Sequence, residues 1–152
     1  MVKLNDDEAR EMAGLLGLDA RTIPGIAAEL ARRWDLRCVV VTLGAKGAFV
    51  HSPGEGNRYS PGYEVNVVDP LGAGDAFTAA FIHCLLHGDT LEHACEWGNR
   101  AGASVVAQKG ATGPLSGRDL EGFGRTGHRR LYDESMKIYT IPLRKSDGMV
   151  WQ

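Results

Sequence analysis

The chain has 152 residues, enough for one domain with a hydrophobic core, and 43% of them are hydrophobic, as is ordinary for a globular protein. A formal net charge of −2 offers no electrostatic basis for binding nucleic acid or an anionic membrane surface, so we expect neither partner and favour small molecules. No apolar run approaches the roughly 20 residues of a membrane helix, and three cysteines without CxxC spacing indicate reduced thiols in a cytoplasmic protein.

The first predicted helix runs from Ala9 to Leu16, where apolar residues recur with helical spacing. Asn5 is a favourable N-cap residue, and Glu8 follows three positions later, as in a capping box. A structural role at the start of the helix therefore explains both side chains.

A second helix is predicted from Ile23 to Trp34, with Thr22 as its N-cap, and we expect Trp34 to lie in the core. The near-continuous apolar run from Arg37 to Leu43 is typical of a parallel strand that is covered on both faces. Residues 44–47 then turn the chain back, and a hairpin turn with positive φ would explain the two glycines there.

The stretch from Ser52 to Tyr59 contains Gly and Pro and predicts a loop, followed by another turn at residues 60–63. Alternation of apolar and polar residues from Tyr63 to Val68 predicts a strand. This strand leads into a small-residue turn and then into an apolar helix predicted over residues 76–86.

The turn consists of Gly72, Ala73 and Gly74, whose small side chains let backbone amides at a helix start approach an anion. Asp75 follows at once, and its carboxylate is placed to take a proton from a hydroxyl that attacks a phosphate. The stretch therefore indicates phosphoryl transfer. The alternative is an ordinary strand-to-helix turn in which Asp75 complements the helix dipole. The stretch from Gly72 to Asp75 matches neither a P-loop nor a complete dinucleotide-binding fingerprint.

A last long helix is predicted from Leu91 to Ala107, with Gly110 in the glycine C-cap that follows it. His83 and His87 lie four residues apart, with Cys84 and His93 nearby, but no HExxH arrangement or cysteine pair accompanies them. We interpret these histidines as helix-surface residues rather than metal ligands.

Three motifs together resemble those of the ribokinase-like, or PfkB, sugar kinases. They read Asn5-x-x-Glu8, Thr42-Leu43-Gly44-x-x-Gly47 and Asp69-x-x-Gly72-Ala73-Gly74-Asp75. The resemblance implies a three-layer α/β fold with a mostly parallel sheet between helices. It also implies that Gly72, Ala73 and Gly74 form the anion hole for the transferring phosphate. The same resemblance makes Asp75 the base that deprotonates the sugar hydroxyl.

The resemblance further implies ATP and Mg²⁺ as cofactors. The residues expected to contact ATP are Thr42, Gly44, Lys46, Gly47, Asn99 and Ala103. Asn5 and Glu8 would organise Mg²⁺ through water, which suits an ion that keeps several of its waters. A site for a monovalent cation such as K⁺ would use Asp69, Leu71, Val105 and Gly110. Pro70 departs from the commoner Thr of the motif and so lacks its hydroxyl, and Pro114 stands where some relatives carry a Ser ligand of the cation.

The resemblance covers residues 1–123, as the C-terminal, ATP-binding and catalytic part of such a kinase, and leaves residues 124–152 without an assigned role. The N-terminal half and the lid, which supply most sugar contacts in the family, lie outside it. A sheet without its neighbouring strands exposes an apolar edge, so we expect a homo-oligomer or a partner chain that covers this edge.

The expected function is ATP-dependent phosphorylation of a sugar hydroxyl, and the motifs are most similar in style to fructokinase-type members. A substrate of the 2-keto-3-deoxygluconate kinase type is an alternative, because Asp69-Pro70 is similar to that group. A different class of function is a non-catalytic nucleotide-binding or assembly module that kept the ATP half alone.

Overall fold

A four-stranded sheet lies at the centre of the structure, a computed structural model that describes residues 1–109 and 115–140. Its strands, in spatial order, are β1 (Val2–Asn5), β2 (Val39–Thr42), β3 (Ala48–Ser52) and β4 (Gly56–Ser60). β1 runs parallel to β2, whereas β2 and β3, and β3 and β4, pair antiparallel. The parallel character expected for most of the sheet is therefore confined, among the described strands, to the β1–β2 pair.

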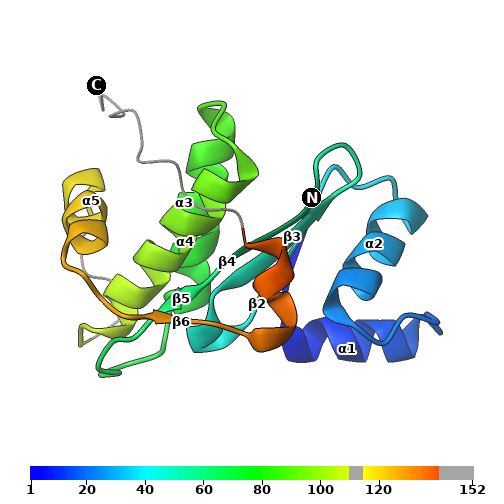
Figure 1. Cartoon of the computed structure of the whole chain (residues 1–152), viewed down its shortest axis with the longest axis horizontal. Coiled ribbons are helices and arrows are strands. Elements are labelled where there is room, and N and C mark those ends of the chain that lie inside the picture. The colour runs from blue at the N-terminus through cyan, green and yellow to red at the C-terminus, as the bar shows by residue number, and fades with distance from the viewer. Residues whose placement is uncertain (110–114, 141–152) are drawn as a thin grey trace.

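Helices cover both faces of this sheet (Figure 1). On one side lie α1 (Asp6–Leu15) and α2 (Ile23–Arg33), and on the other lie α3 (Ala73–Leu86) and α4 (Leu91–Val106). β2 serves both layers, because Val39 and Val41 pack with the first helix pair and Val40 packs with the second. All three valines are fully buried, which confirms the predicted three-layer α/β fold.

The predicted N-caps of the first two helices are confirmed, although α1 begins at Asp6, three residues before the predicted Ala9. Asn5 and Glu8 form the capping box of α1, and the Thr22 hydroxyl accepts the Gly25 amide at the start of α2. The prediction for Trp34 was wrong, because 47% of its surface is exposed. Trp34 follows the last turn of α2 as its C-cap residue, and the Arg33 guanidinium lies 5.1 Å from the centre of its ring.

Residues 52–68 differ from the prediction. β4 replaces most of the expected loop, and its polar sequence fits an edge strand whose Arg58 pairs with Glu92. β5 (Gly62–Tyr63) pairs with β6 (Arg130–Leu131) instead of forming a turn. Residues 64–68 form no strand, since the amides of Val68 and Asp69 donate to the Val106 carbonyl at the end of α4 instead of to a strand neighbour.

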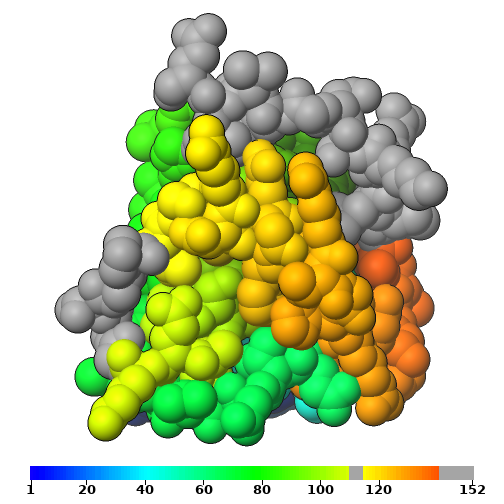
Figure 2. Space-filling model, turned by 90° about the vertical axis from the view of Figure 1, so that its left-hand side faces the viewer, coloured from blue at the N-terminus to red at the C-terminus, as the bar shows by residue number. Residues whose placement is uncertain are grey.

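The described segment of residues 115–140 places its first helix over the outer side of α4 (Figures 1 and 2). It forms α5 (Gly117–Arg125), β6 and the 3₁₀ helix η2 (Glu134–Tyr139). Met136 and Tyr139 join the core formed with α1 and α2. Ile138 and Tyr139 end η2, and Thr140 forms only a single β-bridge with Tyr59.

All three cysteines are buried free thiols, in agreement with the sequence. Among the described helices none is both long and apolar enough to cross a bilayer. α4 ends at Val106 with Ala107 as its C-cap, so the helix ends before the expected glycine C-cap. Gly110 itself lies outside the described residues.

Candidate active site

The start of α3 is built on Gly72, the N-cap residue, which has a φ of +80°. That left-handed conformation strongly favours glycine, because a Cβ atom would be strained there. The helix begins at Ala73, three residues earlier than predicted, so Gly74 and Asp75 belong to its first turn. The small-residue motif is thus the helix start itself.

The first turn of α3 leaves backbone donors available. The Ala73 amide donates to the Pro70 carbonyl at 3.4 Å, whereas the amides of Gly74 and Asp75 have no acceptor among the described residues. Gly74 and Asp75 are exposed. A helix N-terminus with two free N–H groups favours an anion, and the exposed Asp75 carboxylate stands beside these groups.

Close packing between α3 and α4 holds this turn in place. A Cβ atom on Gly102 would lie 3.2 Å from the Ala73 carbonyl oxygen, and one on Gly98 would lie 2.7 Å from the Phe77 ring. The two glycines therefore let α4 approach the start of α3. The Asp69 carboxylate accepts the Leu71 amide at 3.0 Å, which fixes the chain that enters the turn.

Asn5 and Glu8 lie at the carboxyl end of β1, where Asn5 is in register with Thr42 of β2. The Asn5 side chain accepts the Glu8 amide, and the Glu8 carboxylate accepts the Asn5 amide, both at 2.7 Å. Glu8 is exposed, and its Oε1 atom accepts no hydrogen bond from the part of the chain that the structure describes. One carboxylate oxygen therefore remains for a solvated cation.

The turn between β2 and β3 carries the predicted phosphate-contacting residues. Gly44 and Gly47 have φ values of +56° and +95°, as a tight turn requires. The Thr42 hydroxyl donates to the Leu4 carbonyl at 3.4 Å. The Lys46 ammonium lies 3.1 Å from the Asp133 carboxylate, so this lysine already has an anionic partner.

Asn99 does not face open space. Its side chain is buried, and its amide nitrogen donates to the carbonyl and hydroxyl oxygens of Ser60, both at 3.0 Å, and to the Pro61 carbonyl at 3.3 Å. The residue thus connects α4 to the end of β4. Ala103, one turn later on α4, is partly buried.

The residues predicted for a monovalent cation are not gathered by contacts. The Val105 carbonyl accepts the amides of Ala107 and Gln108 at the end of α4. Leu71 is 70% exposed, and the Asp69 carboxylate serves the local turn. Gly110 is not among the described residues, so these residues do not show a formed cation shell.

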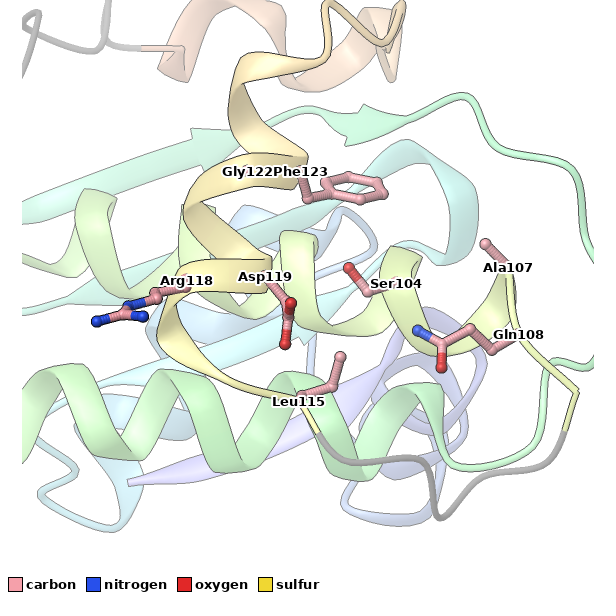
Figure 3. A pocket seen from close by; sticks show the side chains of 8 residues that line it. All are labelled: Ser104, Ala107, Gln108, Leu115, Arg118, Asp119, Gly122 and Phe123. Carbon is pink, nitrogen blue, oxygen red and sulfur yellow. The ribbon is translucent and has the colours of Figure 1, made fainter.

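A hollow of about 490 Å³ lies between α4 and α5 (Figure 3). Ser104 lines it from α4, Gln108 lines it just after the end of that helix, and Phe123 closes one end from α5. Within the described chain, none of the residues predicted for ATP, phosphate or metal lines this hollow. The hollow therefore shares no lining residue with the turn that begins α3.

Glu96 of α4 is the charged residue that sequence reasoning missed. It is 1% exposed and accepts hydrogen bonds from Ser60 at 2.9 Å, from the Tyr63 hydroxyl, from Arg100 at 3.1 Å and from Arg130 at 2.8 Å. Burial raises the pKa of Glu96, but the hydrogen bonds and charge of Arg130 outweigh burial and hold the pKa below its ordinary value. Burial and the Glu96 carboxylate raise the pKa of Tyr63 to about 12.

Arg130, in β6, is the second charged residue of this network. It also donates to the carbonyls of Pro61 and Gly62, and its guanidinium lies 4.0 Å from the centre of the Tyr63 ring. A glutamate within an amphipathic helix gives no sequence signal for this pairing. An arginine 34 residues away gives none either.

Cys84, Asp89 and His93 lie together where α3 passes into α4, with one ligand-type atom from each within 4.8 Å of the others. The Trp97 indole donates to His93 Nε2, which places the proton of a neutral imidazole on Nδ1, 3.4 Å from Asp89. Burial, followed by the Asp89 carboxylate, raises the pKa of Cys84 to about 12. A protonated Nδ1 and a protonated thiol favour a polar contact over a metal centre.

A family model and two curated relatives show what the chain is similar to. The family model described as pfkB family carbohydrate kinase matches residues 1–117. An ATP-dependent ribose-1-phosphate kinase of Halopiger xanaduensis is 44% identical over 78 residues, which are 51% of this chain and 26% of that enzyme. A ribokinase of Haemophilus influenzae is 32% identical over 114 residues, which are 75% of this chain and 37% of the ribokinase.

Solved structures agree with the fold. Ribokinase from Thermotoga maritima superposes with a TM-score of 0.72 at 27% identity, over 81% of this chain and 41% of that one. A double mutant of fructokinase from Vibrio cholerae, solved with fructose, ADP and a potassium ion, gives a TM-score of 0.68 at 32% identity, over 80% and 40% of the two chains. The chain thus spans well under half the length of the proteins that it matches.

Proposed function

Because the chain belongs to the pfkB family of carbohydrate kinases, we propose that it forms the nucleotide-binding and catalytic part of an enzyme that transfers the γ-phosphoryl group of ATP to a sugar hydroxyl. The observation that carries this proposal is the first turn of α3. There, two amides without an acceptor among the described residues stand beside the exposed carboxylate of Asp75.

In the proposed reaction Asp75 accepts the proton of the sugar hydroxyl as its oxygen attacks the γ-phosphorus. The new O–P bond forms while the bond between the γ-phosphorus and the β–γ bridging oxygen breaks, and ADP leaves with that electron pair. The amides of Gly74 and Asp75 donate to the phosphoryl oxygens, which carry the charge of the transition state. Asp75 then returns its proton to solvent.

The residues at the end of β1 fit Mg²⁺. Asn5 and Glu8 would hold it through water, since Glu8 is exposed and its Oε1 atom is not used by the capping box. The ion would neutralise phosphate charge when bound. A potassium ion has less support, because the Val105 carbonyl already accepts two amides.

For the substrate we propose a fructose-type sugar, with a 2-keto-3-deoxygluconate-type acid as the alternative. The likeness to a fructokinase solved with fructose supports the first choice. We also propose that a second copy or a partner chain covers the apolar surface near the site, where Val67, Val68 and Leu71 are 62%, 52% and 70% exposed.

The test is ADP release by the purified chain with ATP, Mg²⁺ and a panel of fructose, ribose and 2-keto-3-deoxygluconate. Asp75→Asn should lower turnover by about 10² to 10⁴-fold, because an amide cannot act as the base. Its ATP affinity, measured by calorimetry, should stay within a few-fold of that of the wild-type chain. Asp19→Asn, which alters an exposed carboxylate in the turn between α1 and α2, is the matched control and should leave turnover unchanged.

Turnover that survives Asp75→Asn would remove the proposed base. ATP binding without turnover on any sugar would instead favour the non-catalytic nucleotide-binding module. That outcome has a physical basis, since the chain spans only 26% of the Halopiger enzyme and 37% of the Haemophilus enzyme.

A further inference from the structure

The ammonium group of Lys3 lies against the first turn of α3. Lys3 sits in β1 between Val2 and Leu4, and Leu4 packs into the core shared with α1 and α2. Strand alternation therefore places Lys3 on the opposite face of the sheet, toward α3. A Cβ atom built on Gly74 would stand 3.3 Å from Lys3 Nζ, so the absence of a side chain at Gly74 leaves room for the ammonium.

This position is unfavourable for a cation by itself. The N-terminus of a helix carries positive potential, and the free N–H groups of Gly74 and Asp75 add further positive partial charge near the ammonium. Among the described residues, Lys3 has neither an ion pair nor a hydrogen-bonded side-chain partner. Positive groups that converge on one exposed point are stabilised when an anion lies between them.

Lys46, the lysine among the residues expected to contact ATP, is placed differently. Its ammonium pairs with Asp133 at 3.1 Å, and the Tyr59 hydroxyl donates to its carbonyl at 2.6 Å. Asp133 in turn accepts the amide and hydroxyl of Ser135. Lys46 therefore links the turn after β2 to Asp133, and its positive charge is already paired with that carboxylate.

We propose that Lys3, and not Lys46, is the lysine that binds the transferring phosphate. Its ammonium contacts the terminal phosphoryl oxygens from the side of β1 while the amides of Gly74 and Asp75 contact them along the axis of α3. This inference rests on the proposed function and deepens it. An ammonium is a compact point charge with three donors, which suits a phosphoryl group that moves between two oxygens.

Calorimetric binding of AMP, ADP and ATP, each with Mg²⁺, tests the assignment on four proteins: wild type, Lys3→Met, Lys3→Arg and Lys46→Met. Lys3→Met should weaken ATP binding by about tenfold or more, because one charge-assisted contact is lost. AMP lacks the terminal phosphates, so its affinity should change less than about twofold. Lys3→Arg should recover most of the ATP affinity, and Lys46→Met should bind all three nucleotides as wild type does.

Methionine keeps the length of the lysine stem, and Lys3→Gln serves as a second variant if Lys3→Met does not fold. Unchanged ATP affinity in the folded Lys3 variant overturns the inference and leaves the proposed function standing. Equal losses for AMP and ATP, or a loss in Lys46→Met alone, also overturn it. A wild-type chain that binds none of the three nucleotides overturns the proposed function and this inference together.

Discussion

A guanidinium nitrogen of Arg130, in β6, lies 2.8 Å from the carboxylate of Glu96, in α4. Glu96 belongs to the part of the chain that matches the family model, whereas Arg130 lies beyond residue 117, where that match ends. The Glu96 side chain is 2% exposed and the Arg130 side chain 22%. β6 is therefore attached to α4 by a largely buried charge pair, even though the sequence assigned no role to residues 124–152.

Replacing Glu96 by Gln should destabilise the chain by about 2 to 4 kcal/mol. The amide keeps the shape of the side chain but removes its charge, and the guanidinium groups of Arg100 and Arg130 lose their anionic partner. Urea unfolding at pH 7, followed by circular dichroism, measures the change.

The matched control is Glu134→Gln. Glu134 also pairs with a cation, Lys137, at 2.7 Å, but its side chain is 81% exposed, so the midpoint should not move. Equal shifts in the two variants would mean that burial of the Glu96 pair contributes nothing to stability.

The same pair predicts a pH dependence. The pKa of Glu96 is held below its ordinary value in the fold, mainly by Arg130 working against burial. The stability that Glu96 contributes is thus fully present above the ordinary carboxyl pKa and is lost as pH falls through the lower, folded pKa. The gap in unfolding free energy between wild type and Glu96→Gln should therefore be widest near neutral pH and narrow below about pH 4.

Unfolding midpoints at pH 7, 5, 4 and 3 measure that gap. Asp119 and Asp133 also have lowered pKa values, but both proteins contain them, so their effect cancels in the difference. A gap that stays constant or widens toward acid would contradict the assigned role of the Glu96 charge.

Local patterns accounted for much of the fold. Asn5 and Glu8 show that a capping box can be identified from residues three apart, because its hydrogen bonds are local. The apolar run of β2 likewise predicted burial on both faces. The start of α3 was predicted to within three residues, since a glycine at positive φ marks the helix start.

Features set by distant contacts could not be predicted. Alternation suggested a strand over residues 63–68, but a strand also needs a neighbour, and Val68 donates its amide to α4. Lys46 looked available in its turn because Asp133 is 87 residues away in sequence. Lys3 gave no signal at all, since only the folded sheet brings β1 against the start of α3.

Replacing glycine by alanine should have opposite effects on stability at Gly98, where α4 packs closely against α3, and at Gly14 in α1. Gly98→Ala should destabilise the chain by about 1 to 3 kcal/mol, because its new methyl group would lie 2.7 Å from the Phe77 ring and force the helices apart. Gly14→Ala in α1 meets nothing within 4 Å and should stabilise by about 0.5 kcal/mol through a less flexible unfolded chain. Thermal and urea unfolding of the two variants measure both changes in stability.

Since Gly102 brings α4 to within contact of Ala73, Gly98→Ala should also weaken ATP binding, whereas Gly14→Ala should not. If both variants gain stability, the helices are not packed as tightly as the glycines indicate, and the turn before Asp75 is held by other contacts.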